Sequence, residues 1–342
     1  MKSRVTTSDV ARAAGVHQTT VSLALRNDPR LREETVRRIK GIAAQLGYVP
    51  DPMLAALASY RRSRRPSGQH GALAWISAWS TRDGWRSNEM FQYFFTGARS
   101  RAQAMGYRLE EFWTKEKGLS HQRLSEILYA RGMLGLILAP QPDGVSSMTL
   151  DWSRFSVVTI GPTLRQPAFH QVSNDQFHTV MRLCESLAQR GFRRIGYSIE
   201  RAVDDRMDGQ WSAAYDRFHR DLPAARQLPR HEAAPSPATL RPWLRMHRPD
   251  VVISCADRPV RGYLSKLAPQ LRQQTASALI GVAQPIPDCL GMHEDPENVG
   301  ATAVEKIVGL IHIGERGIPA NASRTLIESS LFEPQKGELL RS

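Results

Sequence analysis

A short run of side chains near the N-terminus has the types and spacing that suit contact with nucleic-acid bases. Val21 and Leu25 are four residues apart and share one face of a predicted helix that begins at Gln18. The positions assigned to DNA contact are Gln18, Thr19, Thr20, Ser22 and Leu23. An amide such as that of Gln18 can pair with an adenine edge, and threonine or leucine can contact a thymine methyl. Thr20 and Ser22 suit phosphates, which fix the register of a protein on DNA without reading sequence.

Two further helices are predicted to hold this one in place. Thr6 or Thr7 can cap a helix with an apolar inward face, and Asp9 in its first turn suits the helix dipole. Gly15 ends that helix, because glycine adopts the left-handed turn geometry easily, and His17 lies at the next cap. A third helix runs from about Glu33 to Leu46. The predicted inward residues of the first and third helices are Val10, Ala11, Ala14, Val36, Ile39 and Ala43.

Three helices joined through a short glycine turn are typical of a helix-turn-helix domain. The alternative is an ordinary three-helix bundle without a DNA partner. Charge favours the first interpretation. The formal charge of the 342-residue chain is +13, and residues 1–70 hold 13 Lys and Arg against 5 Asp and Glu, a net charge of +8. A basic excess concentrated in a small segment is typical of nucleic-acid binding.

The segment TTSDVARAAGVHQTTVSLAL and its continuation to DPMLAALA resemble the LacI/GalR family of bacterial transcriptional regulators. The matching pattern is D-V-A-x-x-A-G-V-x-x-x-T-V-S, then E-T, then L-G-Y-x-P. The resemblance implies that Gln18, Thr19 and Leu23 read bases in the major groove. His17 replaces the usual serine cap, and Arg26 replaces the common asparagine. We expect Arg26 to contact a phosphate. Thr6 completes the set expected to contact DNA.

A short helix is predicted over residues 51–59, because Asp51 can cap it and Pro52 is favoured at a first helical position. A helix of this length has only marginal stability on its own in water. The resemblance implies a hinge helix that orders on the operator, with Leu57 as a wedge in the minor groove. Leu54, where the family usually has alanine, is included among the DNA-binding residues. Residues 60–71 are arginine-rich and read as a basic linker.

From residue 72 onward, short apolar runs alternate with amphipathic stretches, which indicates doubly wound parallel sheets. The predicted strands are 72–77, 107–113, 135–139, 156–161, 194–199, 250–255 and 277–282. The predicted helices are 88–105, 120–131, 175–190, 208–220, 238–247 and 258–270. So many strands fit two lobes better than one, with a ligand site between them at the carboxyl ends of the strands.

No catalytic signature accompanies these lobes. The sequence contains no GxGxxG after the first strand, no phosphate-binding GxxxxGK[ST], no GxSxG and no HExxH. The cysteines, Cys184, Cys255 and Cys289, form no CxxC pair and indicate neither a zinc site nor a disulfide framework. We therefore expect no enzyme activity, no metal and no cofactor. Neither a secretory signal nor a membrane-spanning stretch is recognisable, so the expected location is the cytoplasm, without membrane partners.

The resemblance continues more loosely through VSNDQFHTVMRLCESLAQRGFRRIGYSI, PDVVISCADRPVRGYL and HEDPENVGATAVEKIVGLI. It implies a type I periplasmic-binding-protein-like core that binds a small effector and forms the dimer. The predicted domains are a helix-turn-helix domain with hinge helix at 1–59, the linker at 60–71, and the core at 72–335. Lobe 1 is expected at about 72–165 and 296–325, and lobe 2 at about 166–295 and 326–335.

The resemblance also implies effector-binding residues. The anchoring arginine of the family's R-x-x-G motif maps to Arg206, with Gly209 as its glycine. The family's Asn-Asp pair maps to residues 256 and 257, where Ala256 replaces the asparagine and Asp257 remains. Ala283 replaces a later acid. An ordinary sugar pose is disfavoured, because a site built for hydroxyls loses affinity without its polar partners. The aromatic candidates for stacking a ligand ring are Trp79, Trp85 and Trp211.

Together these features predict a homodimeric regulator, a repressor, that binds a palindromic DNA operator. A small-molecule effector, expected to be carbohydrate-related, would tune its affinity for DNA. Two alternatives stay open at this point: a two-lobe small-molecule receptor, and a doubly wound enzyme with a DNA-binding appendage.

Overall fold

The computed structural model describes residues 5–25, 28, 30–48, 71–256, 260–264 and 275–334. The predicted hinge helix at 51–59, nearly all of the linker at 60–71, and Arg26, Leu54, Leu57 and Asp257 lie outside the described residues.

The N-terminal domain consists of three helices, α1 (Thr7–Ala14), α2 (Gln18–Ala24) and α3 (Glu33–Gln45). Thr6 and Asp9 form a reciprocal capping box at the start of α1, and Gly15 ends it with a φ of 64°. The buried residues of the three helices form one core, Val10, Ala11, Ala14, Val21, Ala24, Ile39 and Ala43. Leu25 and Val36 are only partly buried against it. The predicted helix-turn-helix packing is confirmed.

The first lobe is built on a six-stranded sheet in the order β10-β5-β4-β3-β1-β2, with every pairing parallel. Its strands are β1 (Gly71–Ser77), β2 (Tyr107–Trp113), β3 (Met133–Leu138), β4 (Ser156–Ile160), β5 (His170–Asn174) and β10 (Arg324–Ile327). Helices α5 (Glu89–Ala104) and α13 (Pro296–Ile313) pack with Leu73 and Trp75 of β1 in one core. Helix α6 (His121–Ala130) packs with the alternate β1 residues Ala74 and Ile76 in another. The sheet is therefore covered on both faces. Two 3-10 turns, Gly84–Ser87 and Trp152–Arg154, complete the lobe.

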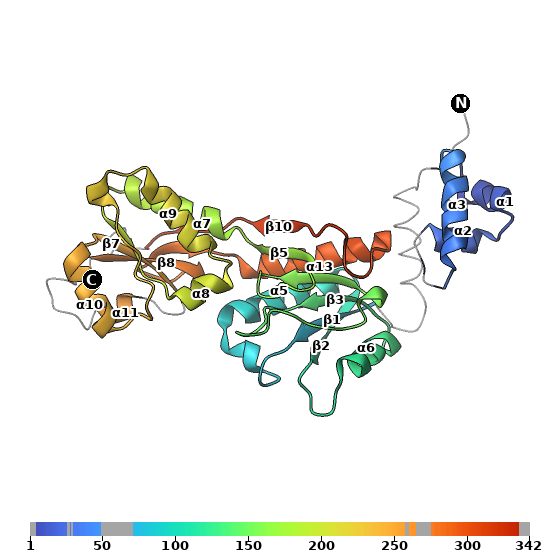
Figure 1. Ribbon diagram of the computed structural model, residues 1–342, viewed down its shortest axis with the longest axis horizontal. Helices are drawn as coiled ribbons and strands as arrows, with labels where there is room; N and C mark the ends of the chain where they lie inside the picture. The colour runs from blue at the N-terminus through green and yellow to red at the C-terminus, as the bar shows by residue number, and fades with distance from the viewer. Residues whose placement is uncertain are drawn as a thin grey trace.

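Helices α5 and α13 cross so closely that only glycine fits at the contact. A Cβ atom added to Gly300 of α13 would lie 1.9 Å from the carbonyl oxygen of Phe94, and one added to Gly97 of α5 would lie 1.9 Å from that of Glu297. In Figure 1 the late segments α13 and β10, coloured orange to red, lie against the first lobe beside β5.

The second lobe has a five-stranded sheet in the order β11-β9-β8-β7-β6. Its strands are β6 (Ile195–Tyr197), β7 (Val251–Cys255), β8 (Ala276–Val282), β9 (Leu290–His293) and β11 (Ser330–Phe332), of which only β11 pairs antiparallel. The accompanying helices are α7 (Gln176–Gln189), α8 (Arg201–Arg206), α9 (Gln210–Arg220), α10 (Pro237–His247) and α11 (Arg261–Leu264), with a 3-10 turn at Ala224–Arg226. Helices α7 and α9 contribute to one core with the sheet, and α10 packs in a smaller one.

The chain passes between the two sheets three times: from β5 to α7, from β9 to α13, and from β10 to β11. Strand β5 pairs with β4 and β10 in the first sheet, whereas lobe 2 was expected to begin at about residue 166. The expected boundary is corrected to the segment after Asn174. The expected helix at 258–270 is observed at Arg261–Leu264, and its other residues fall in or beside the undescribed stretches. Among the described residues, no helix is long and apolar enough to span a membrane.

Candidate nucleic-acid interface and interlobe cleft

The outward face of α2 presents the residues predicted to contact DNA. Val21 and Ala24 are buried in the domain core, whereas Gln18 and Thr19 are exposed, and Thr20, Ser22 and Leu23 are partly exposed. The side-chain amide of Gln18 donates to Oγ1 of Thr7 at 2.7 Å, which orients Gln18 at the start of the helix. Thr19 Oγ1 lies 2.8 Å from Nδ1 of His17, the N-cap residue.

Two contacts outside α2 stabilise the segments that surround it. A guanidinium nitrogen of Arg38, on α3, donates to the carbonyl oxygen of Ala14 at 3.0 Å and so joins α3 to the end of α1. Between α2 and α3, the Arg30 guanidinium donates to both carboxylate oxygens of Asp28 at 2.8 Å, and this hydrogen bonding lowers the pKa of Asp28 to about 2.

Thr6 has a structural contact in addition to its predicted role at DNA. Its hydroxyl donates to a carboxylate oxygen of Asp9 at 2.7 Å, and the Asp9 amide donates back to the hydroxyl oxygen at 3.3 Å. The hydrogen bonds from Thr6 lower the pKa of Asp9.

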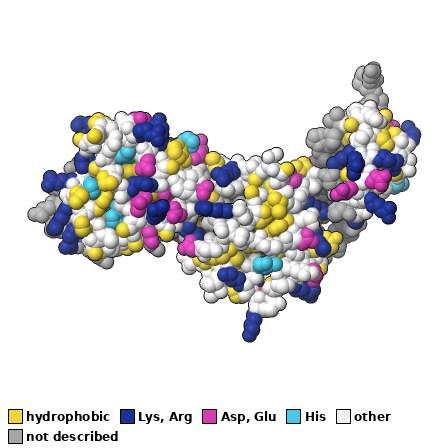
Figure 2. Space-filling model, viewed as in Figure 1, with side chains coloured by type: hydrophobic (Ala, Val, Ile, Leu, Met, Phe, Trp, Pro, Cys, Tyr) yellow, Lys and Arg dark blue, Asp and Glu magenta, His cyan; other side chains and the backbone are white. Residues whose placement is uncertain are grey.

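Lys and Arg side chains of the described residues lie over both the lobes and the N-terminal helices on the face that Figure 2 shows. The candidate interface is therefore defined by the exposed side chains of α2.

A second candidate site is a cleft of about 540 Å³ lined by residues of both lobes. Its first-lobe side includes Trp79, Phe91, Phe94, Lys115, Asp143 and Ile160. Its second-lobe side includes Gln176, Val203, Arg206, Met207, Trp211 and Cys255. The volume is in the range of small-molecule sites, and the cleft lies at the carboxyl ends of strands, as doubly wound sheets predict.

Arg206 lines this cleft, as the resemblance implied. It is the last residue of α8, and its guanidinium forms an ion pair with Asp143 of the first lobe and donates to the Gln141 carbonyl oxygen at 3.1 Å. A second pair joins the lobes nearby, because Arg165 of the first lobe lies 3.2 Å from Asp208 of the second.

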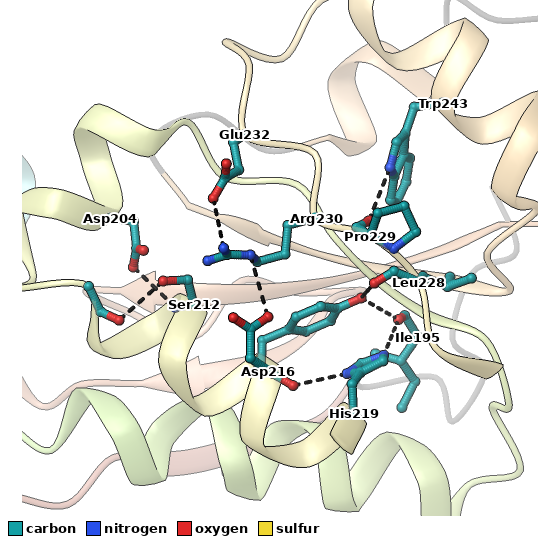
Figure 3. A network of polar contacts seen from close by, with 12 residues as sticks. Ile195, Asp204, Ser212, Asp216, His219, Leu228, Pro229, Arg230, Glu232 and Trp243 are labelled. Carbon is teal, nitrogen blue, oxygen red and sulfur yellow. Dashed lines mark hydrogen bonds and ion pairs between the residues drawn. The ribbon is translucent and has the colours of Figure 1, made fainter. Parts of the chain in front are cut away.

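Helix α8 is fixed to α9 by a buried polar network in the second lobe (Figure 3). Asp204 accepts a hydrogen bond from the Ser212 amide at 3.2 Å, close to Gly209, whose φ is 69°. The hydroxyl of Tyr215 donates to two carbonyl oxygens, those of Ile195 and Leu228, at 3.1 Å each. The Asp204–Ser212 contact holds the α8–α9 corner, from which Arg206 and Trp211 reach the cleft, and Tyr215 fixes α9 to the start of β6 and to Leu228.

The same network buries a histidine. The ring nitrogens of His219 each lie 3.0 Å from a carbonyl oxygen, of Tyr215 and of Ile195. Burial lowers the pKa of His219, and it also lowers the pKa of His231, whose Nδ1 lies 2.9 Å from the hydroxyl of Ser198.

Of the three tryptophans expected to stack a ligand, two line the cleft. Trp79 is partly buried, and its indole N–H donates to the Pro140 carbonyl oxygen at 3.0 Å. Trp211 is 3% exposed.

Trp85 does not line the cleft. It is 1% exposed and packs in the first-lobe core against Trp75 and Phe95, with ring centroids 5.9 and 5.2 Å apart. The expectation that Trp85 binds effector is therefore corrected: the 3-10 turn at 84–87 directs it inward.

Sequence reasoning missed the polar residues at the floor of the cleft, Asn174, Gln176 and Glu294. The amide nitrogen of Asn174 donates to the Glu294 carbonyl oxygen, and that of Gln176 donates to a Glu294 carboxylate oxygen at 3.3 Å. Trp211 in turn donates its indole N–H to the Gln176 amide oxygen. In the sequence these three residues are marked only by their position, because they lie where the chain crosses from one lobe to the other.

Comparisons with known proteins agree with this architecture. Residues 6–51 match the model of the family described as bacterial regulatory proteins, lacI family. A curated relative is the HTH-type transcriptional regulator MalR of Streptococcus pneumoniae, 23% identical over 195 residues. That alignment covers 56% of this chain and 56% of MalR, so the chain spans little more than half the length of this relative.

Two solved structures share the fold over nearly the whole chain. One is the transcriptional regulator CelR in complex with cellobiose, with a TM-score of 0.52, 16% identity, and coverage of 98% of this chain and 100% of CelR. The other is the lac repressor dimer bound to operator and the anti-inducer ONPF, with a TM-score of 0.52, 16% identity, and coverage of 97% and 98%.

The three-helix domain thus matches the lacI-family model, and the two lobes share the fold of these two solved regulators. The predicted resemblance and fold class are confirmed. The matched proteins are named as transcriptional regulators or repressors.

Proposed function

We propose that this protein is a transcription regulator that binds duplex DNA through α2 and responds to a small molecule in the interlobe cleft. The observation that carries the proposal is the coincidence of the lacI-family match at 6–51 with a helix-turn-helix whose exposed residues include Gln18 and Thr19. A helix exposed in this way can enter the major groove and contact base edges.

In this proposal Gln18, Thr19 and Leu23 read bases, while Thr6, Thr20, Ser22 and Arg26 contact the DNA backbone. Hydrogen bonding of Gln18 to Thr7 supports its role, because a side chain already held in one orientation loses less entropy on binding. Residues 51–59 form the hinge helix, with Leu54 and Leu57 at the minor groove.

Two copies of the chain bind a palindromic operator, and the protein acts as a repressor. The lac repressor structure, described as a dimer bound to operator, supports this arrangement for a protein of the same fold. Dimer symmetry predicts half-sites of matching sequence on opposite strands.

The effector binds between the lobes, contacted by Trp79, Arg206 and Trp211, with Asp257 from the adjoining segment. The expected carbohydrate-related class is supported by the cellobiose complex of CelR, a protein of the same fold. The effector shifts the equilibrium between two arrangements of the lobes only as far as its affinities for those two arrangements differ.

Selection of duplexes from a random pool tests the proposal. The full-length protein should enrich one sequence with two-fold symmetry, and fluorescence anisotropy should show tighter binding to it than to a shuffled duplex. Equal binding to both duplexes at modest ionic strength would contradict the proposed function. Enrichment of a single asymmetric half-site would contradict the dimer alone.

A further inference from the structure

The floor of the cleft uses its own hydrogen-bond donors internally. The amide nitrogens of Asn174 and Gln176 are both directed to Glu294, one to its carbonyl oxygen and one to its carboxylate. The Trp211 indole N–H is directed to Gln176, and that of Trp79, on the opposite lobe, to Pro140. One N–H of each of these two amides and both indole N–H groups are therefore already occupied.

A buried carboxyl group lies at this floor. Glu294 lines the cleft, and the residue as a whole is only 3% exposed. Burial alone disfavours the ionised form of such a carboxyl, whereas a cation placed against it favours that form. Once ionised, the carboxylate accepts hydrogen bonds only, and its attraction for a cation is stronger than at the surface.

Within the described part of the chain, the cationic residues that line the cleft are Arg206 and Lys115. Arg206 is paired with Asp143 and bonded to the Gln141 carbonyl oxygen, and Lys115 is exposed to solvent. Among the described lining residues, Glu294 is therefore the ionisable group at the floor.

The walls between these two regions are apolar. They comprise Trp79, Met90, Phe91, Phe94, Ile160 and Met207. Such walls suit the face of a ring, either an aromatic ring or the C–H face of a sugar, and aromatic faces also attract cations.

We propose that the cleft binds a ring compound carrying a protonated amino group, with that group placed against Glu294. The inference rests on the proposed function, because it names the chemical class of the effector. Two sources supply this chemistry, an amino sugar and an aromatic amine. Neutral sugars and sugar acids lack the positive charge, and an anionic group meets repulsion at the floor.

Two matched series of probes test the polar group while the ring stays constant. The first is glucosamine, glucose and glucuronate, and the second is tryptamine, tryptophol and indole-3-acetate. Calorimetric titration of the full-length protein without DNA measures each affinity, and thermal shift reports the same ranking because a bound ligand raises stability. We expect the amine to bind at least about 10-fold more tightly than the other two members in one series. The series in which this occurs identifies the ring.

The variant Glu294→Gln keeps the size of the side chain and removes its charge. It should reduce affinity for the preferred amine by at least about 10-fold and change affinity for the matching neutral alcohol or sugar much less. The matched control is Glu305→Gln on α13, because Glu305 pairs with Arg101 on the surface of the first lobe. It should leave all affinities unchanged.

Two results would overturn the inference: an anionic or neutral probe that binds as tightly as the amine in both series, or no amine binding in either. If the Glu294→Gln variant does not fold, the ranking of probe affinities measured with the unmodified protein still tests the inference. None of these measurements involves DNA. Failure of the duplex selection would therefore contradict the proposed function without changing the ligand ranking, and the reverse also holds.

Discussion

Gln18 is the residue whose chemistry and position together give most support to the proposed DNA recognition. It is exposed at the start of α2, and its amide nitrogen is already engaged with Thr7. Its side-chain amide can read one base edge, whereas the neighbouring hydroxyls are better suited to phosphates.

The change Gln18→Ala should cost about 1–3 kcal/mol of binding free energy at one base position and relax specificity there. Anisotropy titrations against the selected duplex and its single-base variants measure this cost. Gln45→Ala, at the exposed end of α3, is the control and should bind like the unmodified protein. If the Gln18 variant keeps the base preference of the unmodified protein, the proposal that α2 reads bases is contradicted.

Arg26→Ala should weaken binding to all duplexes alike, because a phosphate contact carries no sequence information. The slope of log affinity against log salt should become shallower by about 1. Titrations at several salt concentrations measure that slope. A loss confined to one sequence would assign Arg26 to base reading instead.

At the scale of single elements, the crossing of α5 and α13 places the strictest demand on the sequence. The change Gly300→Ala introduces a methyl group 1.9 Å from the Phe94 carbonyl oxygen. The helices must move apart, which should lower the free energy of unfolding by about 1–3 kcal/mol or more.

Gly309→Ala on the same helix is the matched control, because nothing lies within 4 Å of a Cβ atom added there. Replacing glycine by alanine inside a helix is favourable by up to about 1 kcal/mol, so this variant should be as stable as the original or more so. Urea unfolding of both variants provides the comparison. Equal stability of the two would disprove the close contact.

The second-lobe network makes stability depend on pH. Burial lowers the pKa of His219 and His231 below their ordinary 6.5, so the unfolded chain binds more protons than the folded one around and below that pH. The stabilisation is present above pH 6.5 and is lost as the pH falls below it. Urea unfolding at about pH 7.5 and about pH 5.5 should show lower stability at the acidic pH. NMR titration should place both imidazole pKa values below 6.5; a value above it for either residue would contradict the assignment.

Elements with a clear periodic pattern were predictable from sequence. The helix expected at 88–105 is α5 at Glu89–Ala104, and the strand expected at 107–113 is β2 at Tyr107–Trp113. The strands that were missed among the described residues are all short: β5 reads HQVSN, β9 reads LGMH, β10 reads RTLI and β11 reads SLF. Their strand conformation depends on pairing with neighbours distant in sequence, which local pattern does not reveal.

The cleft was predictable only in part for the same reason. Arg206 belongs to a recognisable motif and lines the cleft, whereas Trp85 has the residue type expected of a binding site but lies in the core. Glu294 and Gln176 meet only because two chain crossings converge.

At the scale of the whole molecule, two ion pairs join the lobes beside the cleft, Arg206 with Asp143 and Arg165 with Asp208. The Asp143 side chain is 83% exposed, so salt screens the first pair, and each exposed pair contributes at most about 1 kcal/mol. Such small contributions still shift a balance between open and closed lobes.

The change Asp143→Asn should favour the open arrangement and increase the radius of gyration of the ligand-free protein, measured by small-angle X-ray scattering. High salt should produce the same change in the unmodified protein. Asp151→Asn is the control, because Asp151 pairs with Arg154 inside the first lobe. An increase in both variants, or in neither, would argue against a role for these pairs in lobe closure.

The three passages of the chain between lobes determine how the protein tolerates shortening. Strands β10 and β11 lie within residues 324–332, yet one completes the edge of the first sheet and the other that of the second. A stop codon shortly before Arg324 would therefore strip both lobes of an edge strand at once. A cut after Asn174 would leave an N-terminal fragment without α13, so neither lobe can be expressed alone as one uninterrupted piece of the gene.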